Sequence, residues 1–334
     1  MATMKDVARL AGVSIATVSA TLSGANFVSP ELKERVHAAI DELGFAPNAM
    51  ARGLKSGKSP LIGLIVPDIT NPFYTQLVHD VQRRAAASGR TVILGASDDD
   101  ARSEAKLIRL MRSHQVAGTI ILPSGSEGDC GKLSGYAGDM PLVAVDNAPP
   151  GIGLDTVVMD NRLAAELATE HILSFGHRSA AIIAGPSHRF VSRERHYGYE
   201  AALERHGITP FTEHMRRGDF HVEEACKVGL ELLGLANRPT AIFVSNNQML
   251  IGVMQAVAAA GLSVPRDISI AAIDDFPWAV AFSPALTTVR QPIDAMATAA
   301  LSFLTDRIAG STSEPQRTML KPDLVVRQSC APPP

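Results

Sequence analysis

The sequence is short of cysteine and of long apolar segments, and each shortage excludes a class of protein. Three of the 334 residues are cysteines, and Cys130, Cys226 and Cys330 form no C-x-x-C pair, which argues against a disulfide framework and a zinc module. The longest apolar runs, such as Leu61 to Pro67, are strand-sized, whereas a membrane span needs about 20 apolar residues. The first residues contain no apolar segment before a small-residue cleavage site. We therefore expect a cytoplasmic protein, with no membrane partner and with buried or idle thiols.

Motifs of several enzyme classes are also missing. The sequence contains no G-x-G-x-x-G, H-E-x-x-H or G-x-S-x-G pattern, and no histidine pair has the spacing of metal ligands. Lys55 to Ser59 resembles part of a phosphate-binding loop, but Arg52 stands where that loop needs glycine. The segment also precedes a predicted strand, whereas a phosphate-binding loop follows one. We expect no catalytic residue, no metal and no cofactor.

What the chain does contain is an ordinary globular composition with a small asymmetry of charge. Hydrophobic residues make up 46% and charged residues 19%. At roughly 100 to 200 residues per domain, the length suggests two or three domains. Residues 1–58 hold seven Lys or Arg against five Asp or Glu, so they carry a net charge of +2 within a total of −3. A mildly basic first part is compatible with nucleic-acid contact at that end.

The first part of the chain predicts a helix-turn-helix. Lys5 to Ala11 has apolar residues at helical spacing, and Gly12 supplies a turn. Ser14 is a suitable N-cap for a second helix that runs to about Leu22. Two short helices joined by a tight glycine turn are typical of this motif.

A third helix and a hinge complete the first part of the chain. Ser29 and Pro30 precede the amphipathic stretch Leu32 to Leu43, which Gly44 closes. Residues 47–54 have the length of one or two helical turns, which are marginal alone and fold only against a partner. We therefore predict a head over 1–46 and a hinge helix with its linker over 47–59.

From residue 60 the pattern changes to apolar strand-length runs that alternate with amphipathic helices. The predicted strands are Leu61 to Pro67, Thr91 to Gly95, Thr119 to Pro123, Leu142 to Asp146, Ala180 to Ala184, Ala241 to Ser245 and Ile268 to Ile273. The predicted helices are Phe73 to Ser88, Arg102 to His114, Arg162 to Phe175, Arg193 to His206 and Gln248 to Ala260.

This alternation indicates parallel sheets that helices cover on both faces, a doubly wound α/β architecture. Residues 60–334 exceed one ordinary domain, so we predict two such lobes behind the all-α head. We place the first lobe at about 60–157 and 290–318, and the second at about 158–289 and 319–330. Open parallel sheets bind ligands beyond the carboxyl ends of their strands, so residues just after the strands are the site candidates.

Several longer motifs resemble one family. The string Met4 to Ser19, with Val28 to Pro30 and the pattern from Leu43 to Leu54, closely resembles the DNA-binding head of LacI/GalR repressors. The resemblance continues in order through the rest of the chain, at Pro67 to Tyr74, Asp160-Asn161, Gly176 to Arg178, Ala184 to Pro186, Arg193 to Tyr199, Ser245 to Gln248 and Asp274-Asp275. It implies a head that reads an operator, a hinge helix in the minor groove and a two-lobed body like a periplasmic sugar-binding protein.

The resemblance places the helix from Ser14 to Leu22 in the major groove of DNA. Its apolar Ile15, Ala16 and Ala20 stand where relatives touch bases, although many relatives carry arginine, the commonest reader of guanine, at the position of Ala20. We infer that thymine methyl groups, hinge contacts and DNA shape carry recognition, or that base contacts come from elsewhere, such as Asn26. The alternative is that Ile15 belongs to the core.

The complete DNA-binding set also includes phosphate and minor-groove positions. Thr17 and Ser19 carry hydroxyls suited to phosphate oxygens, and Leu54 matches a leucine that relatives wedge between base pairs. The remaining expected contacts are Thr3, Ser14, Asn48, Ala51 and Lys55.

The strongest effector candidates are Arg195, Asn246 and Asp274. Asn246 and Asp274 directly follow predicted strands, and a sugar needs carboxylate acceptors, amides and forked donors. The other candidates are Phe73, Tyr74, Asp160, Arg189, Arg193 and Phe220. Two alternatives are structural: Arg195 pairs with Glu194 or Glu200, or Asp274 caps the next turn.

Three positions leave the class of effector open. Arg189 lies where some relatives hold an anionic effector, which keeps a sugar acid, a sugar phosphate or a purine beside a plain sugar as candidates. Asn247 replaces the usual aspartate, and Ala272-Ile273 replace the usual glycine and aromatic residue before Asp274.

The combined prediction is a transcriptional repressor whose affinity for palindromic operator DNA is controlled allosterically by a small polar effector. Because an operator has two-fold symmetry, we expect a homodimer associated with the nucleoid. The sequence ends without leucine heptads, which argues against a tetramer built on a C-terminal bundle. Two alternatives remain: a sugar- or nucleotide-processing α/β enzyme with an accessory head, and a plain binding module.

Overall fold

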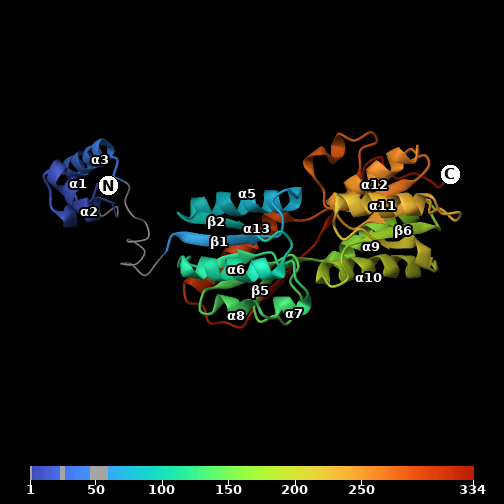
Figure 1. Ribbon diagram of the computed structural model, residues 1–334, viewed down its shortest axis with the longest axis horizontal. Coiled ribbons are helices and arrows are strands. Elements are labelled where there is room, and N and C mark those ends of the chain that lie inside the picture. Colours follow the sequence, from blue (N-terminus) through green and yellow to red (C-terminus); the bar gives the residue numbers. More distant parts are fainter. Residues whose placement is uncertain (1, 23–26, 46–58) are drawn as a thin grey trace. The chain divides into compact units, whose positions relative to one another are not determined.

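The computed structural model describes residues 2–22, 27–45 and 59–334 (Figure 1). The chain divides into two units, residues 1–59 and 60–334, which we call the head and the body. The predicted fold class is confirmed: the head is helical and the body contains two parallel α/β lobes. Among the described residues, no helix is long and apolar enough to cross a membrane.

The head contains the predicted helix-turn-helix. Helix α1 (Met4–Ala11) begins at Thr3, whose side chain and that of Asp6 cap each other's backbone amides. Gly12 ends α1 in the left-handed conformation, at a φ of 62°, which glycine adopts without steric cost. Helix α2 (Ile15–Leu22) follows at once, and the Ser14 Oγ atom accepts a hydrogen bond from the Thr17 amide at 3.0 Å, as a helix cap does.

Helix α3 (Pro30–Leu43) packs over the first two helices and completes a small core of its own. The buried residues are Val7, Ala8, Ala11, Val18, Val36 and Ala39. Arg35 on α3 donates a hydrogen bond to the Ala11 carbonyl oxygen at 2.6 Å, which ties α3 to the turn between α1 and α2. The outer face of α2 is therefore held in a fixed orientation within the head.

The first lobe of the body is a six-stranded sheet in the order β11-β5-β4-β3-β1-β2, with every pair parallel. Its strands are β1 (Leu61–Val66), β2 (Thr91–Ala96), β3 (Thr119–Ile121), β4 (Leu142–Val145), β5 (Asp155–Met159) and β11 (Arg317–Leu320). Helices α5 (Pro72–Ala87) and α13 (Ile293–Ile308) cover one face. The other face carries α6 (Ala101–Ser113), α7 (Glu127–Cys130) and α8 (Leu133–Ala137).

The second lobe repeats this plan in the order β12-β10-β9-β8-β6-β7, with only β12 antiparallel. Its strands are β6 (Ala180–Ala184), β7 (Met215–Arg217), β8 (Ala241–Val244), β9 (Ser269–Ile273), β10 (Thr287–Arg290) and β12 (Asp323–Val325). Helices α11 (Val222–Leu233) and α12 (Asn247–Ala259) cover one face. Helices α9 (Asn161–Ser174) and α10 (Phe190–Arg205) cover the other.

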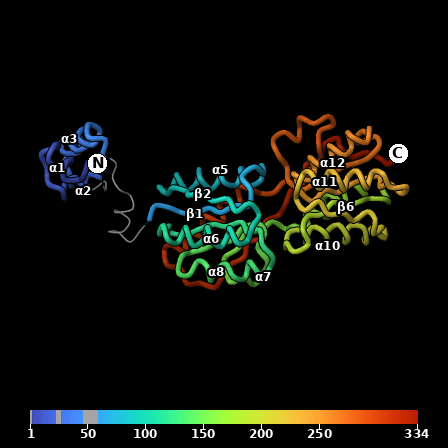
Figure 2. Tube along the Cα trace, in the orientation of Figure 1, coloured from blue at the N-terminus to red at the C-terminus, as the bar shows by residue number. Residues whose placement is uncertain are grey.

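The chain passes between the lobes three times (Figure 2). It crosses after β5, returns after β10 and crosses again between β11 and β12. Helix α13 therefore follows a strand of the second lobe but packs on the first. Each lobe is therefore built from separate stretches of the chain, and β11 of the first lobe extends to Leu320.

Candidate functional site

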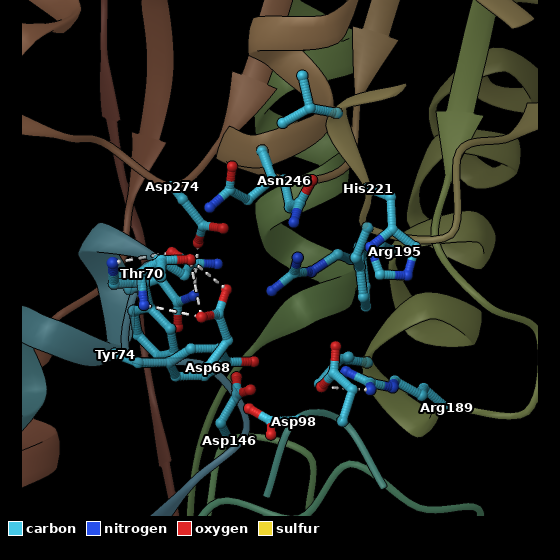
Figure 3. Close-up of a pocket in the computed structure, with 18 of the residues that line it drawn as sticks. Asp68, Thr70, Tyr74, Asp98, Asp146, Arg189, Arg195, His221, Asn246 and Asp274 are labelled. Atoms are coloured by element: carbon cyan, nitrogen blue, oxygen red, sulfur yellow. Dashed lines mark hydrogen bonds and ion pairs between the residues drawn. The ribbon is translucent and has the colours of Figure 1, made fainter. Parts of the chain in front are cut away.

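A cavity of about 350 Å³ lies in the body between residues that follow strands of both sheets (Figure 3). Asp68, Asp98 and Asp146 come after β1, β2 and β4 of the first lobe. Asn246 and Asp274 come after β8 and β9 of the second lobe. This is the position at which open parallel sheets bind ligands.

Asp146 is the most buried acid on the first lobe's side of the cavity. The residue is 6% exposed, and its backbone has a φ of 67°, held by a hydrogen bond from its amide to the Val157 carbonyl oxygen. Among the described residues, its Oδ1 atom has no hydrogen-bond partner. Burial raises the pKa of Asp146 to about 6, Asp274 adds to the rise, and Arg195 opposes it. An unpaired buried acceptor of this kind is suited to a ligand hydroxyl group.

Arg195 on α10 brings a positive charge into the cavity. Its Nε atom donates to Asn161 Oδ1 at 2.7 Å, and its Nη1 atom donates to the Ser245 carbonyl oxygen at 2.5 Å. The structural alternative for Arg195 is wrong, because Glu194 pairs with Arg162 and Glu200 with His196, each at 3.3 Å. Figure 3 shows the guanidinium pointing into the cavity, where its remaining N–H groups can meet a ligand.

Asp274 and Gln291 form a buried pair opposite Asp146. The Gln291 Nε2 atom donates to Asp274 Oδ1 at 2.6 Å, and Gln291 Oε1 is a second buried acceptor without a partner among the described residues. The carboxylate of Asp274 is thus directed at the cavity and does not cap a turn. Asn246 does cap a helix, since its Oδ1 atom accepts from the Met249 amide at 2.9 Å. Its Nδ2 group is the part of Asn246 that can bind a ligand.

Aromatic side chains supply apolar surface to the same cavity. Phe73 and Tyr74 lie at the start of α5 with ring centroids 5.0 Å apart, and Phe220 approaches from the second lobe. Burial raises the pKa of Tyr74 well above its ordinary value, so its hydroxyl remains a donor. Flat apolar faces beside carboxylates and amides suit the C–H face and the hydroxyl edge of a sugar ring.

Two of the nine expected effector residues, Asp160 and Arg193, do not line the cavity. Asp160 caps α9 instead, accepting from the Leu163 amide at 2.9 Å. Arg193 donates to the carbonyl oxygens of Ser187 and His188 and pairs with Glu127. Successive helix residues are about 100° apart, so Arg193 and Arg195 leave α10 in opposite directions. We therefore remove both residues from the effector set.

The cavity is also lined by acidic and amide residues that were not among the predicted effector residues. Asp68, Asp146 and Gln291 each follow a strand of the structure, and Thr70 and Asn71 lie in the loop that leads to α5. For Asp146 the position after an apolar run was a usable signal, because it ends the predicted strand Leu142 to Asp146. For Gln291 the signal was weak, since the short strand β10 carries two threonines.

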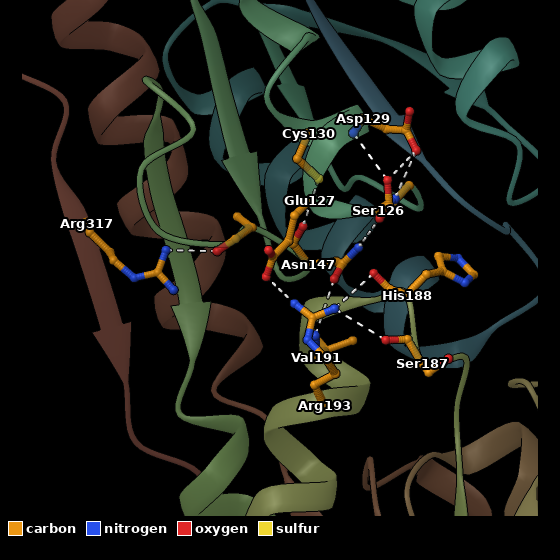
Figure 4. A network of polar contacts seen from close by, with 12 residues as sticks. Ser126, Glu127, Asp129, Cys130, Asn147, Ser187, His188, Val191, Arg193 and Arg317 are labelled. Carbon is orange, nitrogen blue, oxygen red and sulfur yellow. Dashed lines mark hydrogen bonds and ion pairs between the residues drawn. The ribbon is translucent and has the colours of Figure 1, made fainter.

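Several contacts join the two lobes around the cavity. Asn247 Nδ2 donates to Asn71 Oδ1 at 2.9 Å, and Arg189 pairs with Asp99 at 2.8 Å. Figure 4 shows Asn147, whose side chain donates to the Gly125 carbonyl oxygen and accepts from the Val191 amide. These contacts require the lobes to stay close, so an opening of the cavity breaks them.

In the head, the residues expected to touch DNA occupy the outer side of the helix-turn-helix. Ser14, Ile15 and Ala16 are exposed, while Val18 and Thr21 face the core. Ile15 is 44% exposed, so the alternative that assigns it to the core is wrong. Of the other expected contacts, Thr3 is exposed and Thr17, Ser19 and Ala20 are partly exposed, whereas Asn26, Asn48, Ala51, Leu54 and Lys55 lie outside the described residues.

A helix-turn-helix head in one chain with a two-lobed body around a polar cavity defines a class, the DNA-binding regulator that responds to a small ligand. Residues 3–48 match the family described as bacterial regulatory proteins, lacI family. Residues 169–330 match the periplasmic binding protein-like domain.

Individual relatives are similar to this protein over nearly the whole length of the chain. The protein is 36% identical to the ribose operon repressor of Escherichia coli, over 98% of this chain and 100% of that one. It is 33% identical to the transcriptional repressor PurR of Photobacterium profundum, over 98% of both chains. A crystal structure of the Lac repressor dimer bound to operator and the anti-inducer ONPF matches with a TM-score of 0.89, 27% identity and 99% coverage of both chains. The chain belongs to the LacI family.

Membership of this family decides between the classes that the sequence left open. The relatives are transcriptional repressors, so the protein is a transcriptional regulator with a DNA-binding head and a ligand-binding body, and not an enzyme. In the described part of the chain, no group of three or more His, Cys, Asp or Glu side chains is arranged to hold a metal ion.

Proposed function

We propose that the protein represses transcription as a homodimer on a palindromic operator, and that a small polar effector in the body cavity controls its affinity for DNA. The observation that carries the effector part is the polar cavity, two of whose lining residues, Asp146 and Gln291, each keep a buried acceptor atom (Oδ1 and Oε1) that has no partner among the described residues. Such atoms are destabilising until a ligand satisfies them. The cytoplasmic nucleoid is the corresponding location.

The chemistry of the cavity supports a compound of one sugar ring with several hydroxyl groups. Asp146 and Asp274 accept hydrogen bonds, Arg195 and Asn246 donate them, and Phe220 offers an apolar face. A volume of about 350 Å³ lies near the lower end of ligand cavities, which favours a monosaccharide over a disaccharide. The ribose operon repressor among the relatives makes a pentose a natural first probe.

The control of DNA binding follows from the contacts between the lobes. An effector that bridges Asp146 and Asp274 holds the lobes together. When the cavity is empty, only direct contacts between the lobes do so, namely Asn247–Asn71, Arg189–Asp99 and Asn147–Val191. The effector thus changes the balance between closed and open bodies. Because two sites are coupled, effector and operator change each other's affinity by the same factor.

The test is a selection of genomic fragments by the full-length protein at a stated salt concentration, with and without a panel of sugars. We expect one motif with two-fold symmetry, whose recovery changes with one sugar. Failure to enrich any motif, even with a metabolite pool added, would contradict the proposal. Turnover of a bound sugar would contradict it as well.

Ile15→Ala is expected to change base preference near the edge of each half-site. The exposed Ile15 side chain at the start of α2 is suited to contact a thymine methyl group. Its loss should reduce the preference for thymine at one position by about 1 kcal/mol or more, as a mismatched base pair does. Selection from randomised sites measures this change. An unchanged motif would show that Ile15 does not contact a base. Ser19→Ala is the control: Ser19 is an expected phosphate contact, so its loss should weaken binding to all sequences alike.

Leu54→Ala is expected to weaken operator binding without changing effector affinity. An apolar side chain wedged between base pairs bends the duplex and extends the contact, so we expect at least a tenfold loss. Titration of operator and effector with the same variant separates the two affinities. Equal DNA affinity in the variant would exclude Leu54 from the mechanism.

A further inference from the structure

Arg189 is a cavity arginine whose charge is already neutralised by the protein. It precedes α10, and its side chain is 6% exposed. Its Nη2 atom donates to Asp99 Oδ1 at 2.8 Å, and the guanidinium carbon lies 5.5 Å from the centre of the Phe220 ring. Its Nε atom is buried and has no hydrogen-bond partner among the described residues. The group is thus directed toward the cavity but is held by a carboxylate of the opposite lobe.

The loop that carries Asp99 is built to hold that carboxylate in place. Asp98 and Asp99 both adopt left-handed backbone conformations, at φ values of 51° and 58°, which non-glycine residues seldom take in succession. The Ser97 and Asp99 amides donate to the carbonyl oxygens of Val66 and Pro67, and Asp100 caps α6. Strained backbone of this kind persists where the surroundings fix it and is often functional.

The charge of the rest of the cavity is unfavourable for an anion. Six carboxyl side chains line it, Asp68, Asp98, Asp99, Asp146, Glu223 and Asp274, against the two arginines Arg189 and Arg195. Arg195 is fixed by Asn161 and the Ser245 carbonyl oxygen, and its charge acts on the nearby Asp146. A phosphate or carboxylate on a ligand would therefore meet an excess of negative charge, while the positive charge of Arg195 already acts on Asp146.

We propose that Asp99 is a specificity-determining residue: by occupying Arg189, it makes the cavity select uncharged ligands and reject their phosphorylated and carboxylated forms. This inference rests on the proposed effector function of the cavity. In this proposal Arg189 lines the cavity but does not bind anions. Freeing Arg189 should convert the same cavity into one that accepts an anion.

Asp99→Asn tests the proposal, with Asp98→Asn as the matched control. Both substitutions remove one negative charge at neighbouring positions, and asparagine tolerates the left-handed conformation of both. Only Asp99→Asn removes the carboxylate that holds Arg189. Calorimetric titration of the full-length proteins with D-ribose, ribose 5-phosphate and inorganic phosphate gives the affinities. A third protein, Asp99→Asn with Arg189→Met, assigns any gain to the arginine.

We expect Asp99→Asn to bind ribose 5-phosphate and inorganic phosphate at least about tenfold more tightly than the unsubstituted protein, as one charge-assisted hydrogen bond provides. Asp98→Asn should change these affinities less than about threefold, and the double variant should lose the gain. No gain in Asp99→Asn, an equal gain in Asp98→Asn, or a gain that survives in the double variant would each overturn the proposal. If no sugar binds the unsubstituted protein, the proposed effector class fails, while the phosphate titration still decides the role of Asp99.

Discussion

Asp146→Asn is expected to make the protein more stable and, at the same time, to abolish its response to the effector. Burial raises the pKa of Asp146 to about 6, so at pH 7 the carboxylate is ionised at a free-energy cost of up to about 3 kcal/mol relative to an exposed one. The amide has the same shape and no charge, and asparagine tolerates the positive φ of this position. A gain of this order raises the melting temperature by several degrees in a body of this size.

The effector should bind the same variant at least about tenfold more weakly. A hydrogen bond from a ligand hydroxyl to a carboxylate contributes about 1.5–3 kcal/mol, more than one to a neutral amide oxygen. Operator binding in the absence of effector should be unchanged, because Asp146 lies in the body. Thermal melts together with effector titration measure both effects. A variant that is less stable than the unsubstituted protein, or that binds effector normally, would exclude this role of Asp146.

The pH dependence of the two proteins gives an independent check. The folded pKa of Asp146 is raised, so its contribution to stability is fully present below about pH 4 and is lost as the pH rises through 6. The free energy of unfolding of Asp146→Asn should therefore exceed that of the unsubstituted protein at pH 7 and approach it near pH 4. Effector affinity should change in the opposite sense, rising between pH 5 and 7 as the acceptor ionises. An equal stability difference at pH 4 and pH 7 would contradict the assignment.

Arg195→Met is expected to have the largest destabilising effect of any single change in the cavity. Arg195 is 3% exposed, and its loss leaves Asn161 Oδ1 and the Ser245 carbonyl oxygen without their donor. It also removes one of the two positive charges, Arg195 and Arg189, that act on Asp146. Removing one partner of a buried charged group costs about 3–5 kcal/mol, and methionine preserves most of the apolar volume. Denaturant unfolding measures this loss, and the effector response should disappear with it.

The double variant of Arg195→Met and Asp146→Asn separates electrostatics from packing. If the two side chains interact through charge, removing the carboxylate should restore a large part of the stability that the arginine substitution removes, a coupling of about 1–3 kcal/mol. Effector binding should stay absent, because both a donor and an acceptor are missing. Strict additivity of the two stability changes would show that Arg195 acts on the fold through its hydrogen bonds alone.

Much of the architecture could be predicted because its signals are local. The caps at Ser14 and Ser29 and the glycines at 12 and 44 fixed the helices of the head, and each confines its effect to one helical turn. All seven predicted strands of the body are present, since each contains an apolar run, and all but the edge strand β2 are largely buried. Five strands were missed: β5, which has five residues, and the shorter β7, β10, β11 and β12. Edge strand β7 (Met215–Arg217) contains two arginines and has no periodicity to detect.

Site residues could be predicted only where the strand that precedes them could be predicted. Seven of the nine expected effector residues line the cavity, because the position after a strand and the family resemblance pointed the same way. Asp160 and Arg193 failed because a helix cap and the direction of a side chain around a helix are not visible in a motif. The Arg189–Asp99 pair joins residues 90 positions apart on different lobes. No sequence spacing reports such a contact.

The three crossings between the lobes also limit how early each lobe can fold during synthesis of the chain. Strands β11 and β12 are consecutive, yet one belongs to the first sheet and the other to the second. The first sheet is therefore complete only after Leu320 has been synthesised, and the second only after Val325. The head has its own core and can fold from residue 45 onward. At about 5–20 residues per second, it precedes the body on the ribosome by tens of seconds. A nascent chain released early would therefore carry a folded helix-turn-helix head on a body in which each sheet lacks its last strand.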